Sequence, residues 1–341
     1  MCFSQIIGHR RLLALLSRSV EHDSLPPSLL FAGPAGVGKR LTALAVAQAL
    51  NCLKSSTFQG PASGLAFDAC GTCAVCTRIV RGVHPDVAVV EPGDSGSIKI
   101  DQVRDIVDRS AYRPFEGRRR VVIIDEADAL VTAAQHALLK TLEEPPSSSV
   151  FILVTARPDV LLPTVRSRCP QLRFRPLAAA DIATVLVARG HSESEARAVA
   201  ATADGSLGQA LAASAGEHVE ARDVAQRVLA YASANREPAR RIDVAKELLA
   251  KTGATGAGDR DQLASHLRAM ASLLRDVEVL ATRADERALA NPDVRPALER
   301  LTPAYRGERG VRAFSAIGEA LEALERNAGV KVVADWLVLQ L

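Results

Sequence analysis

The sequence predicts an α/β domain built on a parallel sheet, followed by an all-α part. In the first half, short apolar runs alternate with helical patterns, which is typical of parallel strands covered by helices on both faces. Beyond about residue 176, every pattern is helical. Hydrophobic residues make up 48% of the 341 residues. They suffice to bury full cores, which excludes a disordered chain and a small disulfide scaffold.

Five apolar runs bounded by turn residues are the expected strands. They lie at 28–32, 87–90, 121–124, 150–154 and 171–174. We expect helices between them at 39–50, 101–111 and 128–142, the last ended by Pro145-Pro146. In the second half we expect short helices at 181–189, 192–203 and 207–213, and longer amphipathic ones at 218–232, 241–249, 262–284, 311–327 and 332–341, with a linker at 253–258.

The charge balance and the start of the chain limit the class of protein. Lys and Arg number 42 against 39 Asp and Glu, a net charge of +3, so any nucleic-acid contact is expected to be local. No run reaches the ~18 apolar residues that a membrane span needs. The first residues lack the basic and apolar pattern of a secretory signal, so we expect a cytoplasmic protein without membrane contact.

The strongest motif follows the first expected strand and reads Gly33-Pro34-Ala35-Gly36-Val37-Gly38-Lys39-Arg40. It fits G-x-x-x-x-G-K between a strand and a helix, the context of a phosphate-binding loop (P-loop). Loop amides and the positive end of the helix would hold phosphates, and Lys39 would reach the β and γ oxygens. The candidate nucleotide-binding residues are Gly33, Pro34, Gly36, Val37, Gly38 and Lys39. The alternative is a glycine-rich turn before a helix.

Position 40 departs from this motif. A Ser or Thr hydroxyl normally follows the lysine and binds Mg²⁺, but here the residue is Arg40. A guanidinium has no oxygen to offer and repels a cation. Thr42 is no substitute, because successive helical residues are about 100° apart. We therefore expect a loop that can hold phosphates, with ATP as a candidate ligand, but that binds Mg²⁺ poorly.

Two carboxylates, Asp125 and Glu126, follow the third expected strand. At the carboxyl end of a buried strand they would lie beside the nucleotide. Asp125 would then hold Mg²⁺ and Glu126 would polarise the attacking water. The alternative is that both acids merely complement the dipole of a following helix.

Four cysteines, Cys52, Cys70, Cys73 and Cys76, have the spacing C-x17-C-x2-C-x2-C. In a cytosolic protein such a cluster favours a metal over disulfides. Four thiolates form a closed tetrahedral set, so we predict a structural zinc site that orders a glycine-rich module at about 52–76. A redox pair or free thiols are the alternatives.

At this point the sequence resembles a known family. Three segments carry the resemblance: Ile123-Ile124-Asp125-Glu126-Ala127-Asp128, Ala137-Leu138-Leu139-Lys140-Thr141-Leu142-Glu143-Glu144-Pro145-Pro146, and Pro163-Thr164-Val165-Arg166-Ser167-Arg168-Cys169. Together with the cysteine module they are similar to the bacterial clamp-loader branch of the AAA+ ATPases. The resemblance covers about residues 3–215 by motif. It implies an AAA+ P-loop domain at 1–176, a small helical lid at 177–215 and a helical collar domain for oligomerisation at 216–341.

The family resemblance also implies a function. Such subunits form a five-membered arc within DNA polymerase III that opens a sliding clamp and places it on primer-template DNA. The branch contains motor subunits, called gamma or tau, and a stator, called delta-prime, beside the clamp-opening delta. Three features favour the stator type: Arg40 in the P-loop, Gly208 where a second sensor would carry Arg, and an end at Leu341 before any tau-like extension.

The resemblance assigns roles to two further residues. Arg168, in Ser167-Arg168-Cys169, stands where the family projects an arginine finger into the neighbouring subunit's ATP site. Thr155 matches the first-sensor position that contacts the γ-phosphate. Their alternatives are a surface ion pair for Arg168 and an ordinary β-branched strand residue for Thr155. We thus expect weak or absent ATPase activity of the chain itself; the competing hypotheses are a self-sufficient motor and a scaffold that binds no nucleotide.

Overall fold

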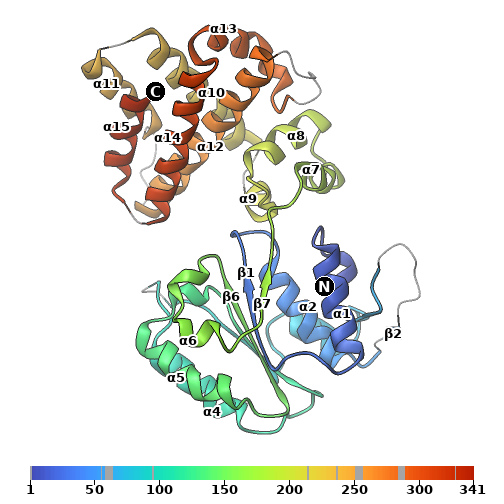
Figure 1. Ribbon diagram of the computed structural model, residues 1–341. Helices are drawn as coiled ribbons and strands as arrows, with labels where there is room; N and C mark the ends of the chain where they lie inside the picture. The colour runs from blue at the N-terminus through green and yellow to red at the C-terminus, as the bar shows by residue number, and fades with distance from the viewer. Residues whose placement is uncertain are drawn as a thin grey trace. The chain divides into compact units, whose positions relative to one another are not determined.

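The computed structural model describes residues 2–54, 56–57, 64–93, 96–212, 215–235, 237–249, 256–282, 289–326 and 328–341. The chain divides into two compact units, Met1–Ala178 and Ala179–Leu341 (Figure 1). The first unit is α/β and the second is all-α, which confirms the predicted fold class. The boundary at residue 215 stays a prediction, because the helices on both sides of it belong to the second unit.

The first unit is built on a five-stranded parallel sheet with the order β4-β5-β6-β1-β7. Its strands are β1 (Ser28–Ala32), β4 (Val87–Val90), β5 (Arg120–Ile124), β6 (Ser149–Thr155) and β7 (Gln171–Arg173). All five predicted strands are present, with ends displaced by at most one residue. Because the strands are parallel, their carboxyl ends share one edge, where ligands of open α/β sheets bind.

Alternate residues of β1, β5 and β6 enter two separate cores. Leu29 and Phe31 of β1 pack on one face, and Leu30 packs on the other. Helices cover both faces (Figure 1): α1 (Arg10–Glu21), α2 (Lys39–Asn51) and α3 (Ala74–Val80) on one, α4 (Ile100–Ser110) and α5 (Thr132–Glu143) on the other. Burial on both faces explains why these strands read as continuous apolar runs.

Smaller elements complete the first unit: η1 (Phe3–Gln5), β2 (Ser56–Thr57), β3 (Phe67–Asp68), η2 (Ala127–Ala129), η3 (Pro158–Val160) and α6 (Pro163–Arg166). The prediction of one helix over 128–142 is wrong at its start. The chain forms the short η2, and Leu130 then makes a parallel bridge with Ile98 before α5 begins at Thr132. The bridge imposes an extended backbone at Leu130, so the helix cannot run through it.

A buried carboxylate orders the loop before β5. The side chain of Asp86 is fully buried and accepts hydrogen bonds from the backbone N–H groups of Phe115, Glu116 and Gly117 at 2.7–2.9 Å. Arg120 donates to the same carboxylate at 3.1 Å. Burial by itself raises the pKa of Asp86. The hydrogen-bond donors lower it by a larger amount, so the pKa lies below its usual value.

The second unit is a helical bundle. It contains α7 (Ala179–Ala188), α8 (Glu193–Thr202), α9 (Leu207–Ala212), α10 (Ala215–Ala234), α11 (Pro238–Leu248), α12 (Gly256–Ala281), η5 (Pro292–Val294), α13 (Arg295–Tyr305), α14 (Glu308–Glu325) and α15 (Val330–Gln340). The predicted linker 253–258 is corrected in part, because 256–258 already belong to α12, while 253–255 lie outside the described residues. The residues that α12 contributes to the core begin at Leu263, and Gly256 and Gly258 give the start of the helix the composition of a linker.

Several buried polar groups of this bundle core are hydrogen-bonded. Asp276 is fully buried and accepts hydrogen bonds from the backbone N–H groups of Ala290 and Asn291 at 3.0 and 2.8 Å. The hydroxyl of the buried Tyr305 donates to the carbonyl of Leu229 at 3.0 Å. Across the described helices of both units, none combines the length and apolar character that crossing a bilayer requires.

Candidate functional site

The P-loop connects β1 to α2 at the carboxyl edge of the sheet. Gly33 directly follows β1, and Gly38 precedes α2 with φ of 99°, a backbone conformation that favours glycine. A Cβ on Gly33 would lie 2.2 Å from the carbonyl oxygen of Phe174. The six predicted nucleotide-binding residues thus share one tightly curved loop at a helix N-terminus, the arrangement that binds phosphate groups.

Lys39 lies folded against this loop. Its ammonium donates to the carbonyl oxygens of Gly33 at 2.7 Å and Pro34 at 2.6 Å, and the residue is only 6% exposed. Burial lowers the pKa of Lys39, while Asp125 and Asp128 act against the shift. An ammonium held by loop carbonyls has to exchange these partners for phosphate oxygens when a nucleotide binds.

Asp125 and Glu126 lie directly after β5, as predicted. Glu126 is exposed and has a φ of 49°, a left-handed conformation that is uncommon outside glycine. Its N–H donates to the Asp125 carboxylate at 3.0 Å. Burial raises the pKa of Asp125, and burial together with neighbouring carboxylates raises that of Glu126.

Arg40 holds the carboxylate that was expected to bind Mg²⁺. Its guanidinium donates to Asp125 Oδ2 at 3.3 Å and makes a closer ion pair with Glu91. Thr42 is buried and its hydroxyl donates to the carbonyl of Gly38, so it offers no metal ligand here. Glu91 was not among the predicted site residues. It directly follows the strand run at 87–90, and parallel strands end at one edge of the sheet, so its position could have indicated it.

Thr155 ends β6, and its hydroxyl is already engaged. It donates to Asp128 Oδ1 at 2.8 Å, and the residue is fully buried. Arg157 donates to the other oxygen of Asp128 at 3.0 Å. Nothing in the sequence indicated Asp128 or Arg157 as partners of the first-sensor position. A Thr155 hydroxyl that donates its proton to Asp128 can still accept a hydrogen bond, but it cannot donate one to a phosphate.

Arg168 follows α6, which places it among residues of α5 and α6. Its guanidinium donates to the carbonyl of Thr164 at 2.9 Å and forms an ion pair with Glu143, the last residue of α5. Its Nε is buried and has no hydrogen-bond partner among the described residues. The ion pair is partly exposed, with side chains 33% and 48% accessible, so it contributes only ~0–1 kcal/mol. A stronger anion can displace Glu143 at little cost.

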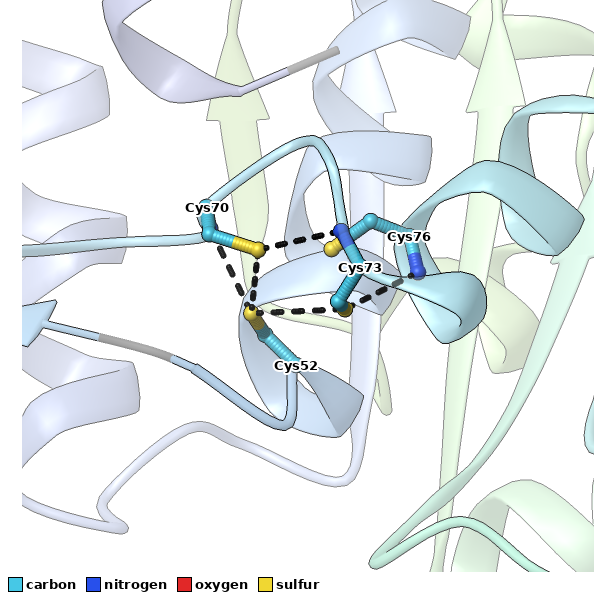
Figure 2. Close-up of side chains that lie close together, drawn as sticks. All are labelled: Cys52, Cys70, Cys73 and Cys76. Carbon is cyan, nitrogen blue, oxygen red and sulfur yellow. Dashed lines mark hydrogen bonds between the residues drawn. The ribbon is translucent and has the colours of Figure 1, made fainter.

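The four predicted cysteines converge at the end of α2 and around the start of α3 (Figure 2). Their sulfur atoms all lie within 4.8 Å of one another. The sulfur of Cys52 is 3.5 Å from that of Cys70 and 4.0 Å from that of Cys73. A tetrahedral Zn²⁺ with Zn–S bonds of about 2.3 Å separates its sulfurs by about 3.8 Å. The cluster therefore has the dimensions of a four-thiolate metal site.

Backbone donors surround this cysteine cluster. The N–H groups of Cys70, Cys73 and Cys76 donate to the sulfurs of Cys52, Cys70 and Cys73 at 3.3–3.5 Å. Burial raises the pKa of Cys70, but the N–H donors of Thr72 and Cys73 outweigh it and bring the pKa to about 6. Burial raises the pKa of Cys76. All four cysteines are free, and N–H groups directed at sulfur favour the thiolates that metals bind.

Residues 8–178 match the family model for "DNA polymerase III, delta subunit". The chain belongs to this family. The match confirms the resemblance to bacterial DNA polymerase III clamp-loader subunits that the motifs indicated, and it spans the unit that carries the P-loop, the cysteines and Arg168.

Individual relatives include both types of subunit. The gamma/tau subunit of Mycobacterium bovis is 36% identical over 51% of this chain and 29% of its own length. The delta' subunit of Pseudomonas aeruginosa is 39% identical over 50% of this chain and 49% of its own. The delta' subunit of Bacillus subtilis is 35% identical over 56% of this chain and 54% of its own length. The chain thus spans about half or less of these relatives, and the choice between the two types depends on the site residues.

Proposed function

We propose that the chain is a delta-prime-like stator subunit of the DNA polymerase III clamp loader. In this role it would assemble with gamma or tau and delta subunits in the cytoplasm and help to place the sliding clamp on primer-template DNA. The observation that carries the proposal is the Arg40–Asp125 contact, because it occupies the carboxylate that a motor subunit uses for Mg²⁺. Gly208, at the second-sensor position in α9, likewise has no side chain to offer a phosphate.

Magnesium does not fit the described residues of the pocket. Mg²⁺ requires oxygen ligands at about 2.0–2.1 Å in octahedral geometry, but position 40 supplies a cation. Asp125 already accepts from that cation, and the Thr42 hydroxyl is turned to Gly38. The nucleotide itself fits better, since the glycines and Lys39 of the loop are in place. We infer that the chain's own ATPase is weak or absent.

Zinc fits the cysteine cluster. Four sulfur donors within 4.8 Å match a closed tetrahedral site without a position for substrate. Zn²⁺ would cross-link the end of α2 to the start of α3, and its role would be structural.

Arg168 is the group that this chain would lend to a neighbour. A guanidinium can grip γ-phosphate oxygens through parallel charge-assisted hydrogen bonds and stabilise the charge of phosphoryl transfer. Its weak, partly exposed pairing with Glu143 leaves guanidinium donors that a phosphate can satisfy. We propose that it acts in trans, in the ATP site of an adjacent gamma or tau subunit.

The isolated chain tests the proposal against a motor ATPase. We expect Mg²⁺-dependent ATP hydrolysis at background level, unchanged in a Glu126→Gln variant, because no metal is held beside that carboxylate. The measurement is steady-state phosphate release by the purified chain. Sustained hydrolysis that Glu126→Gln removes would instead identify a self-sufficient motor.

A further inference from the structure

The position of Arg40 has a consequence for what the pocket binds. The guanidinium bridges two strand ends, since Glu91 follows β4 and Asp125 follows β5. Asp125 is largely buried, with 14% of its side chain exposed, whereas Arg40 and Glu91 are about half exposed. The arginine thus places a fixed positive charge at the edge of the sheet, beside the P-loop from which its own helix starts.

The charges around the loop define the ligand. Lys39 and Arg40 face three carboxylates, Glu91, Asp125 and Glu126, which concentrate negative charge at this edge of the sheet. A γ-phosphate that reaches these acids without a metal would add further negative charge beside them. The loop amides, the helix end and Lys39 lie on the other side and suit the inner phosphates.

We propose that Arg40 is a tethered cation in place of Mg²⁺, and that the pocket binds a nucleoside diphosphate in its metal-free form. The inference rests on the proposed P-loop pocket and not on the action of Arg168. Arg40 is part of the chain and pairs with Asp125, so the affinity for the diphosphate does not depend on a divalent cation. An Arg40→Thr variant removes the tethered charge and supplies the missing hydroxyl, and it should recruit Mg²⁺ with the nucleotide.

Binding of ADP and ATP to the full-length chain, measured by calorimetry in Mg²⁺ or in EDTA, tests the proposal. For the unmodified chain we expect ADP affinities that agree within about 2-fold in the two buffers, and tighter binding of ADP than of ATP in EDTA. For the Arg40→Thr variant we expect an ATP affinity at least 10-fold higher, on the order of 1.4 kcal/mol, in Mg²⁺ than in EDTA. Lys39→Ala should lose binding of both nucleotides.

Arg166→Thr is the matched control. Arg166 lies on α6 and pairs with Asp159 at 3.0 Å, and its loss should leave ADP binding as in the unmodified chain. Circular dichroism checks that each variant is folded. We expect the Arg40 variant to fold, because this side chain is partly exposed.

Three results would overturn the inference. They are a tenfold gain in ADP affinity with Mg²⁺ in the unmodified chain, no ADP binding at about 1 mM, or an Arg40→Thr variant that remains indifferent to Mg²⁺. None of them bears on the trans role of Arg168, which is measured as the turnover of a neighbour.

Discussion

An Arg168→Ala variant is expected to lower ATP turnover at the neighbouring site that it completes by about 10³–10⁵-fold, the value of an arginine finger. The reason is electrostatic, because the guanidinium neutralises charge that develops on the γ-phosphate in the transition state. The measurement is DNA-stimulated ATPase activity of the reconstituted loader, together with clamp loading onto primed DNA. The total ATP turnover of the loader should fall by the fraction that this one site contributes.

Two variants separate this role from a structural one. Glu143→Gln breaks the ion pair of Arg168 but keeps the guanidinium, so turnover should survive. Arg166→Ala removes a neighbouring arginine of α6 and should also leave turnover intact. If Arg168→Ala and Glu143→Gln have the same effect, Arg168 acts only as a partner of Glu143.

A Cys76→Ser variant is expected to lose the metal and to destabilise the first unit. Cys76 is fully buried, and its sulfur is one of the four in the cluster. A structural Zn²⁺ contributes apparent binding free energies of about 10–16 kcal/mol in zinc-finger peptides, so a lost ligand weakens the whole module. We expect the unmodified chain to carry one zinc, and the variant to carry almost none and to melt at least ~10 °C lower, which for a unit of this size is several kcal/mol.

Cys169→Ser is the control for a buried cysteine outside the cluster. Cys169 is 2% exposed, and burial raises its pKa to about 12. This variant should keep its zinc even where the loss of packing lowers its melting temperature. Elemental analysis of the reduced, unmodified chain that finds no bound zinc would contradict the assignment.

The sequence predicted the centre of the sheet well because β1, β5 and β6 are buried on both faces and therefore appear as continuous apolar runs. The P-loop was equally readable, since its glycines and Lys39 are adjacent in the chain. The start of α5 was not, because a bridge between Leu130 and Ile98, far apart in the sequence, fixes the backbone there.

The partners of the site residues could be read only in part. Position 40 showed that a metal ligand was missing, but the pairing of Arg40 with Asp125 and Glu91 depends on how the strand ends of β4 and β5 meet α2. The bond between Thr155 and Asp128 likewise joins β6 to η2. Such contacts join elements that are far apart in the sequence, so no local pattern predicts them. The motifs therefore identified the site residues but not the partners of those residues.

A single comparison separates a stator from a motor: Glu126→Gln and Arg168→Ala are placed separately into the same reconstituted loader, and DNA-stimulated ATP turnover is measured. We expect Glu126→Gln to leave turnover unchanged, because this chain's own pocket does not hydrolyse ATP, and Arg168→Ala to silence a neighbour. Turnover that falls with Glu126→Gln and is indifferent to Arg168→Ala would contradict the proposed stator role.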